Sequence, residues 1–302
     1  MFEFVYKSIL SPGNSRIAFH FWFHLKRALV AIFSDPSCTL GVHGRMLKMP
    51  LSHALPLSLN LYPFYDKLPC RLSDFIYHKY GHLNLIDVGA NIGDTIAAFY
   101  RHDSDKFLAI EPNPNFLSYL TANFDHDPNV EILSCMCSSG ETTSQYHIHE
   151  HNGTASLKEA ETGAQIESKT IDDLVMGNPV FHNFNVIKID TDGYDLRIIA
   201  GAINIIKKNK PAILFEVYDN ESPTYCEDCI NTLLLLKDAG YDSFLLYDRL
   251  GYLMGQHHLN DLFHFKQLLT HQITSDIGNT DILVMKSDDM EQFHLEEVSA
   301  FK

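Results

Sequence analysis

The chain has 302 residues, of which 45% are hydrophobic and 20% charged, an ordinary globular composition that argues against extensive disorder. Its 23 Lys and Arg against 38 Asp and Glu give a formal net charge of −15. Phosphate backbones repel such a chain and we find no local basic patch, so no nucleic-acid partner is expected. A cationic ligand would be attracted instead.

The N-terminal residues and the cysteines indicate a cytoplasmic protein. Residues 1–10 lack the basic start, the apolar run and the cleavage site of a secretory signal. The six cysteines are expected to be reduced thiols. Cys226 and Cys229 have CxxC spacing, but no second pair at zinc-binding spacing accompanies them, and Cys135 with Cys137 does not supply one. No structural zinc site is therefore predicted.

In chain order, the first predicted element is residues 17–33, IAFHFWFHLKRALVAIF, an aromatic and aliphatic helix interrupted by Lys26 and Arg27. It is too short and too charged to span a membrane, which takes about 20 apolar residues, so no transmembrane segment is predicted. It fits an amphipathic helix in peripheral contact with a membrane or a lipid-linked substrate. It also fits a helix packed on the main domain or on a second subunit of a homo-oligomer, which we favour. Gly41–Leu61, with its spaced prolines, predicts short strands and loops rather than a helix.

From Leu83 onward, short apolar runs alternate with helical segments. The predicted strands are Leu83–Val88, Phe107–Ile110, Val130–Ser134, Val186–Ile189, Ala212–Val217, Ser243–Tyr247 and Asp281–Lys286. The predicted helices run from Asp94, as a cap, through Tyr100, and over Asn115–Phe124, Asp195–Lys208 and Tyr225–Ala239. This alternation predicts an open α/β sheet with helices on both faces.

The segment Glu141–Thr170 interrupts the alternation. Its His147, His149 and His151 would share one side of a strand, because side chains alternate with period two. Three imidazoles in successive same-face positions rarely converge on one tetrahedral ion. Exposed histidines on an edge strand are therefore favoured over a metal site.

The turn after the first strand of the sheet lies in LIDVGANIGDT, Leu85–Thr95. Ligands of open α/β sheets bind beyond the carboxyl ends of the strands. Gly89 permits a sharp turn, and Gly93 would let the next helix begin close to a ligand. The G-x-x-x-G spacing is not the dinucleotide motif G-x-G-x-x-G, and no P-loop Lys-Ser/Thr pair follows. Asp94 stands where a phosphate would sit, so the turn predicts a ligand without phosphate that carries positive charge.

Glu111 ends the second strand of the sheet, in AIEPNPN. An acid at this place can accept both hydroxyls of a ribose. The simpler alternative is a carboxylate near a helix start that the following prolines favour. Taken together, the two strand ends predict an adenosine ligand without phosphates. S-adenosylmethionine, with a ribose, a zwitterionic amino acid and a sulfonium cation, fits this description.

Two further strand ends carry charge. VIKIDTDGYD places Lys188, Asp190 and Asp192 at the end of a strand expected beside the first one. ILFEVYDN places Glu216 within the end of the next apolar strand. An acid inside such a run costs free energy unless it is paired or functional, so these residues are candidates for catalysis.

These segments resemble the FkbM-type S-adenosylmethionine-dependent methyltransferases over roughly Leu83 to Lys286. The matching segments are IDVGANIGDT, IEPNPNFLSYLTANF, NGTASL, TIDDL, IKIDTDGYDLRIIAGA and PAILFE. The resemblance implies a Rossmann-like class I methyltransferase sheet, mostly parallel with an antiparallel last strand, and methyl transfer to a hydroxyl oxygen. We expect an N-terminal extension of an aromatic helix plus short strands (1–80), a methyltransferase domain (81–290) and a C-terminal tail (291–302).

The resemblance also implies roles for individual residues. The cofactor-binding residues would be Asp87, Gly89, Ala90, Asn91 and Gly93 at the methionine end, Asp94 and Thr95 at the helix start, Glu111 at the ribose, Asn113 by the adenine and Asp190 beside the transferring methyl group. The catalytic residues would be Asp190, Glu216, Lys188 and Asp192. Family members more often have Glu where this chain has Asp192 and Asp195, and these shorter acids reach less far.

Methyl transfer to a hydroxyl needs alignment and a deprotonated acceptor. We expect Asp190 or Glu216 to be the general base, with Lys188 and Asp192 setting its pKa or position. A magnesium-type ion held by Asp190 and Glu216 ranks second, and no metal is predicted. Two alternatives are a non-catalytic S-adenosylmethionine-binding or assembly protein and, less favoured, an NAD-linked oxidoreductase. The acceptor stays open among sugars, glycans, secondary metabolites and other hydroxylated small molecules.

Overall fold

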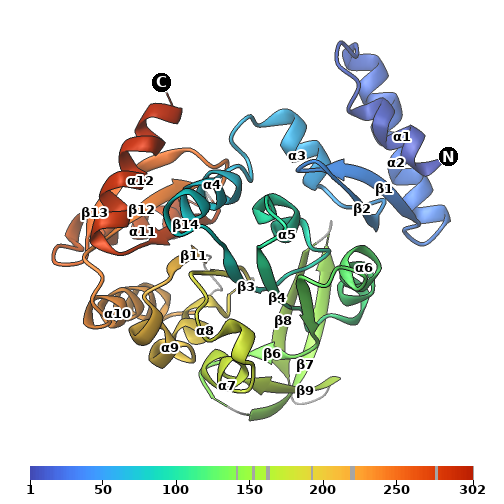
Figure 1. Ribbon diagram of the computed structural model, residues 1–302. Coiled ribbons are helices and arrows are strands. Elements are labelled where there is room, and N and C mark those ends of the chain that lie inside the picture. The colour runs from blue at the N-terminus through green and yellow to red at the C-terminus, as the bar shows by residue number, and fades with distance from the viewer. Residues whose placement is uncertain are drawn as a thin grey trace.

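The computed structural model describes residues 1–140, 142–151, 154–160, 164–191, 193–217, 222–275 and 278–301. For residues 142–151, 154–160 and 164–166 it describes the backbone only. Figure 1 shows the arrangement of the elements along the chain.

Among the described residues, eight strands form one sheet in the order β13-β12-β14-β11-β10-β3-β4-β5. Their bounds are β3 (Asn84–Val88), β4 (Lys106–Ile110), β5 (Val130–Leu133), β10 (Val186–Ile189), β11 (Ala212–Val217), β12 (Ser243–Asp248), β13 (Leu253–His258) and β14 (Thr280–Val284). β11, β10, β3, β4 and β5 pair in parallel, whereas β14 is antiparallel to both β11 and β12. The predicted mostly parallel sheet with an antiparallel last strand is confirmed.

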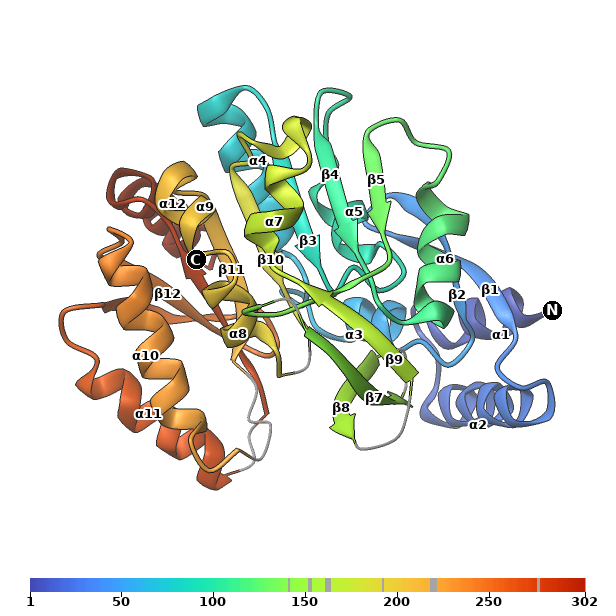
Figure 2. The ribbon, with the colours of Figure 1, turned by 90° about the horizontal axis from the view of Figure 1, so that it is seen from below.

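The central strands of this sheet, β3, β4, β10 and β11, are buried on both faces. Along β3, Leu85 joins one apolar cluster, while Ile86 and Val88 join the cluster on the opposite face. The first cluster includes side chains of α4 (Leu68–Tyr80), α5 (Asp94–Phe99), α6 (Pro114–Phe124) and α12 (Ser287–Ala300). The second includes side chains of α7 (Ile171–Met176), α8 (Asp195–Ala200), α9 (Ile203–Asn209), α10 (Tyr225–Asp238) and α11 (Phe263–Ser275). Helices thus cover both faces, as predicted (Figures 1 and 2).

The predicted strands agree with the observed ones to within two residues, but two expectations for helices were wrong. The predicted helix Asp195–Lys208 is divided into α8 and α9 at Gly201, where an added Cβ would lie 2.1 Å from the carbonyl oxygen of Ser138. The segment Gly41–Leu61 contains one strand (Arg45–Pro50) and the end of another (Ser37–Val42), but also a helix, α3 (Leu55–Leu61). A proline in its first turn is compatible with that helix because no backbone N–H is needed there.

The N-terminal segment packs on the sheet domain. Its antiparallel hairpin, β1 (Ser37–Val42) and β2 (Arg45–Pro50), contributes to the same apolar cluster as α4, α5 and α6. Helices α1 (Phe2–Ile9) and α2 (Arg16–Ile32) lie beside the hairpin at the edge of the molecule (Figure 1). The hydroxyl of Tyr6 donates to the carbonyl of His53 at 2.5 Å, so α1 is joined to the segment before α3.

The C-terminal helix is also tied to the domain. Glu297 of α12 is buried and accepts hydrogen bonds from Arg71 of α4, at 2.5 and 2.9 Å, and from the hydroxyl of Tyr247 of β12, at 2.9 Å. Residues assigned by sequence to an extension and to a tail therefore pack against the central sheet.

The segment that interrupts the alternation forms a smaller sheet in the order β6-β9-β7-β8. Its strands are β6 (Met136–Cys137), β7 (Thr142–His151), β8 (Thr154–Ala160) and β9 (Ala164–Lys169). β9 pairs with residues 142–146 of β7, so the part that carries His147, His149 and His151 pairs with β8 alone among the described strands. The side chains of these histidines lie outside the described residues.

Gly93, which precedes α5, packs against α6. Its φ is +88°, and an added Cβ would lie 2.3 Å from the ring of Phe124 and 3.1 Å from Leu120. The expectation that this glycine makes room for a ligand was wrong, because the space beside it is filled by the ring of Phe124.

We predict that Gly93→Ala destabilises the protein by about 2–4 kcal/mol, because left-handed backbone and overpacking both oppose the new methyl group. Gly81→Ala is the matched control, since Gly81 has φ +74° and nothing within 4 Å of the added Cβ. The control should cost about 1–2 kcal/mol. Equilibrium urea unfolding measures both changes, and equal losses would contradict the packing argument.

Candidate active site

A cavity of about 440 Å³ opens at the carboxyl ends of β3, β4, β10 and β11. A second hollow of about 160 Å³ adjoins it and shares part of its wall, including Asp94, Lys188, Asp190 and Glu216. The charged strand ends predicted from the sequence therefore meet at one place. This is the edge at which open α/β sheets bind their ligands.

The turn after β3 is held against the ends of both neighbouring strands. The backbone N–H groups of Gly89 and Ala90 both donate to the carbonyl of Ile110 at 3.0 Å. Gly89 has φ +83°, and an added Cβ would lie 1.9 Å from the carbonyl oxygen of Asp190. The glycine is required because the backbones of β3 and β10 approach each other here.

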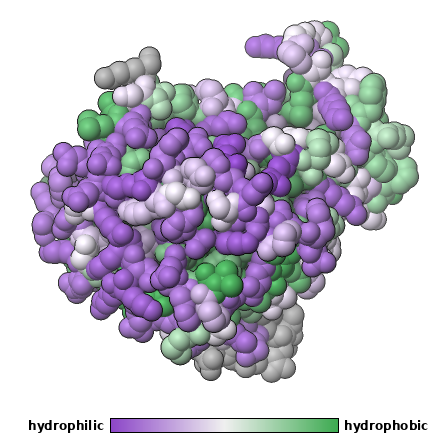
Figure 3. Space-filling model, viewed as in Figure 1, coloured by the Kyte–Doolittle hydropathy of each residue, from purple (hydrophilic) through white to green (hydrophobic). Residues whose placement is uncertain are grey.

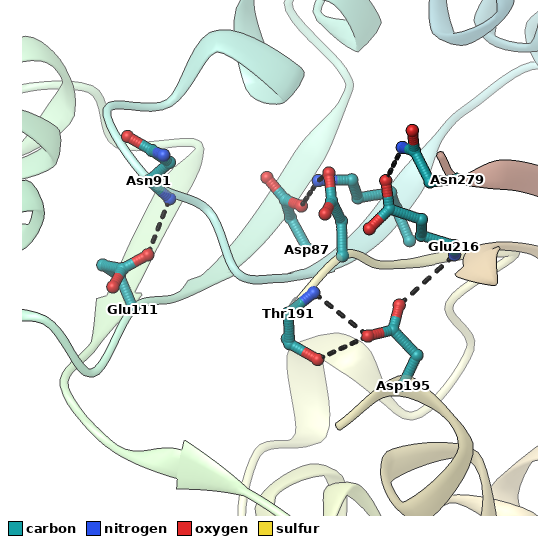
Figure 4. Close-up of polar contacts among 9 residues, drawn as sticks. Asp87, Asn91, Glu111, Thr191, Asp195, Glu216 and Asn279 are labelled. Atoms are coloured by element: carbon teal, nitrogen blue, oxygen red, sulfur yellow. Dashed lines mark hydrogen bonds and ion pairs between the residues drawn. The ribbon is translucent and has the colours of Figure 1, made fainter. Parts of the chain in front are cut away.

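Glu111 is fixed at one end of the larger cavity (Figure 4). One carboxylate oxygen accepts from the backbone N–H of Asn91 at 2.8 Å, the contact drawn in Figure 4. The other accepts from the backbone N–H of Asn113, also at 2.8 Å. Asn113 in turn caps α6 by accepting from the N–H groups of Asn115 and Phe116. Burial raises the pKa of Glu111 to about 7. Since each carboxylate oxygen has a second lone pair, this acid can still accept hydrogen bonds from a ligand.

Lys188 lies on the cavity wall, between two carboxylates. Its Nζ is 3.2 Å from Asp190 Oδ2 and 3.7 Å from Asp87 Oδ1. Burial opposes the charge on Lys188, but Asp190 and Asp87 outweigh it and raise the lysine pKa. Burial also raises the pKa of Asp87 to about 6. Asp87 is fully buried and is not among the residues that line the cavity, whereas the side chain of Asp190 is 48% exposed.

Asp195, the first residue of α8, joins the ends of β10 and β11 (Figure 4). One carboxylate oxygen accepts from the backbone N–H and the hydroxyl of Thr191, at 3.1 and 2.7 Å. The other accepts from the backbone N–H of Glu216 at 3.2 Å. Burial raises the pKa of Asp195 to about 6. The shorter acid at this position therefore does reach both strand ends.

Several residues of the second hollow were not predicted from the sequence. Asn279 donates to the carboxylate of Glu216. Asp281 of β14 lies directly opposite Glu216 in the antiparallel register of β14 and β11. Burial raises the pKa of Asp281 to about 8 and that of Asp94, on the same wall, to about 7. The wall is thus rich in carboxyl groups that can accept hydrogen bonds from hydroxyls, with Lys188 and Arg249 as basic residues on it.

A partly buried Cys-His-Asp group supports one side of this hollow. Asp66 lines it and lies 2.7 Å from Nε2 of His43, whose Nδ1 is 3.5 Å from the thiol of Cys70. His43 and Asp66 both have positive φ, +47° and +53°. Burial alone would lower the pKa of His43, but the hydrogen bonds with Asp66 and Cys70 raise it to about 9. The tip of the β1–β2 hairpin thereby holds an acid at the site, a contact between distant segments that no local motif signals.

Most of the predicted site residues line the larger cavity, namely Gly89, Asn91, Asp94, Thr95, Glu111, Asn113, Lys188, Asp190 and Glu216. Asp87, Ala90 and Gly93 lie behind its wall, and Asp192 lies outside the described residues. Among the described residues, no group of three or more His, Cys, Asp or Glu is arranged to hold a metal ion. Cys226 and Cys229 are free thiols.

Comparison with known proteins identifies related sequences. The family model described as Methyltransferase FkbM domain matches residues 87–243, just over half of the chain. The hexuronic acid methyltransferase AglP of Haloferax volcanii is 34% identical over 128 residues, which cover 41% of this chain and 51% of the relative. The chain therefore spans about half the length of this curated relative.

Two solved structures are more distant. A methyltransferase FkbM from Methylobacillus flagellatus KT is 16% identical, with a TM-score of 0.41, covering 70% of this chain and 47% of that one. An O-methyltransferase from Bacillus cereus in complex with SAH is 11% identical, with a TM-score of 0.43, covering 77% and 89%. At these TM-scores neither likeness bears on function.

We predict that His43 contributes stability that depends on pH. Its folded pKa, about 9, lies above the ordinary value of 6.5, so the contribution is fully present below pH 6.5 and is lost as pH rises through about 9. The difference in unfolding free energy between the wild type and His43→Gln should therefore shrink between about pH 6 and about pH 10. Urea unfolding across this range measures it, with the exposed His24→Gln as control. A constant difference would show that His43 does not gain its proton on folding.

Proposed function

Because the chain belongs to the methyltransferase FkbM domain family, we propose that it transfers the methyl group of S-adenosylmethionine to a hydroxyl oxygen of a sugar, a glycan or a similar hydroxylated metabolite. The family resemblance noted in the sequence is confirmed. The observation that carries the proposal is one cavity with Glu111 at one end and the Lys188–Asp190 pair at the other.

The residues of the larger cavity fit this cofactor. Glu111 and Asn113 offer a rigid carboxylate and a helix cap to the adenosine, and Asp94 and Asp190 give negative charge to the wall that would face the sulfonium. Asp94, the first residue of α5, occupies the place where a dinucleotide fold binds phosphate. This arrangement favours S-adenosylmethionine over NAD.

When bound, the cofactor supplies an electrophilic methyl carbon and a neutral sulfur leaving group. The chain must then align the acceptor hydroxyl and take its proton. We assign the proton to Asp190, because its half-exposed carboxylate reaches the cavity while Lys188 holds it in place at 3.2 Å. Glu216, oriented by Asn279 on the adjoining wall, would position the acceptor. Asp192 remains a candidate for a supporting role.

The acceptor class follows from two considerations. The second hollow, which adjoins the proposed cofactor cavity, is lined by carboxylates that suit a ligand with several hydroxyl donors. In addition, the relative from Haloferax volcanii is named a hexuronic acid methyltransferase. Both favour a sugar.

We predict that the protein binds S-adenosylhomocysteine and does not bind NAD in isothermal titration calorimetry. Glu111→Gln should weaken S-adenosylhomocysteine binding by about 10- to 100-fold, because a hydrogen bond to a charged group is worth about 1.5–3 kcal/mol. Glu227→Gln, at an exposed position on α10, is the control and should bind as the wild type does. Saturable binding of NAD without S-adenosylhomocysteine would overturn the assignment.

We predict that Asp190→Asn lowers kcat by about 10²- to 10⁴-fold, the usual worth of a general base, with S-adenosylhomocysteine affinity unchanged. Transfer of labelled methyl groups to 4-nitrophenyl glycosides, neutral and uronic, measures the rate. Full wild-type activity in EDTA is expected as well. Loss of that activity in EDTA, restored by Mg²⁺, would favour the metal mechanism instead.

A further inference from the structure

The two N-terminal helices expose an apolar surface, which we define as Met1, Phe4, Ile17, Phe21, Ile32 and Phe33. The exposed fractions of these residues are 76%, 64%, 83%, 59%, 70% and 50%. Figure 3 shows apolar residues gathered at the upper right, where α1 and α2 lie in Figure 1. Contiguous apolar patches of this kind mark interaction sites.

The exposed side of α2 is itself divided into two stripes. Ile17, Phe21, Ala28 and Ile32 fall within about 60° of one another on a helix with 100° per residue. The exposed residues His20, His24 and Arg27 form the adjacent stripe. An apolar stripe beside a stripe of histidine and arginine side chains is the pattern of an amphipathic helix that lies in the plane of a membrane interface.

The charge of this segment is opposite to that of the rest of the chain. Residues 1–33 contain Lys7, Arg16, Lys26 and Arg27 but a single acid, Glu3, in a chain of formal charge −15. Lys7, Arg16 and Arg27 are exposed. These residues are spread along the sequence, so they form a basic border only once the two helices are folded.

The helices are held rigidly enough to present this surface. Phe4 of α1 packs edge-on against Trp22 of α2, with ring centroids 5.7 Å apart. Lys26, the buried cation, lies 4.2 Å from the ring centroid of Tyr6 and donates to the carbonyl of Ser52 at 3.4 Å. Asp35 accepts from the N–H and hydroxyl of the same Ser52, at 2.8 and 2.6 Å.

We propose that α1 and α2 dock this apolar surface onto an anionic lipid bilayer, with Lys7, Arg16 and Arg27 at the phosphate level. Docking is peripheral, because no described helix is long and apolar enough to cross a bilayer. A second copy of the chain fits less well. An isologous contact through this surface would place the basic border against its own copy, whereas anionic headgroups complement it.

The test is co-sedimentation of the full chain with vesicles of phosphatidylcholine alone and of phosphatidylcholine with phosphatidylglycerol. Binding is expected to the anionic vesicles and should weaken as salt rises. Ile17→Ser with Phe21→Ser and Ile32→Ser should weaken binding at least about tenfold, and Arg16→Glu with Arg27→Glu should abolish the preference for anionic lipid. Met254→Ser with Leu295→Ser, exposed apolar residues on other elements, is the matched control.

Light scattering after size exclusion tests whether a second copy of the chain covers the surface instead, and equilibrium urea unfolding shows that each variant is folded. A dimer that the triple variant dissociates, without vesicle binding by the wild type, would overturn the proposal in favour of self-association. Equal sedimentation of the wild type and the triple variant would overturn it as well. Failure to methylate any acceptor leaves this result unaffected, because docking does not depend on the proposed reaction.

Discussion

The backbone contact between the turn after β3 and the end of β10 is the constraint on which the site depends. The N–H of Asp190 donates to the carbonyl of Val88 at 3.0 Å, and only a residue without Cβ fits at Gly89. The same turn is bound to Ile110 at the end of β4. Three strand ends are therefore brought together by main-chain contacts, which place Glu111, Lys188 and Asp190 around one cavity before any ligand is considered.

The charges and protonation states of the carboxyl groups around that cavity then determine which kinds of ligand it favours. Burial raises the pKa values of Asp87, Asp94 and Glu111 toward neutrality, so a cluster of carboxyls can lie close together without the full cost of several buried charges. The positive charge of Lys188 offsets the negative charges of Asp87 and Asp190, with which it forms ion pairs. Such a wall disfavours phosphate and suits hydroxyl donors and cations.

The central sheet could be predicted from the sequence because each of its buried strands is a continuous run of apolar residues, a pattern that can be recognised within the strand itself. The turn after β3 and the place of Glu111 at the end of β4 could be predicted for the same reason. His43, Asp66 and Asp281 could not, because each reaches the site through contacts between segments far apart in the chain. β13 was missed because LMGQHH is a half-exposed edge strand without an apolar run, and Gly93 was misread because its neighbour Phe124 lies on another helix.

Asp195 has a consequence for how the site works. β10 ends at Ile189, so no strand residue is left to pair with the N–H of Glu216, and the Asp195 carboxylate takes that place while also holding Thr191. Moving either strand end away would leave a buried carboxylate without its donors, which costs several kcal/mol. The spacing of the two strand ends that carry Asp190 and Glu216 is therefore set when the protein folds, and a ligand that uses both residues would not have to assemble it.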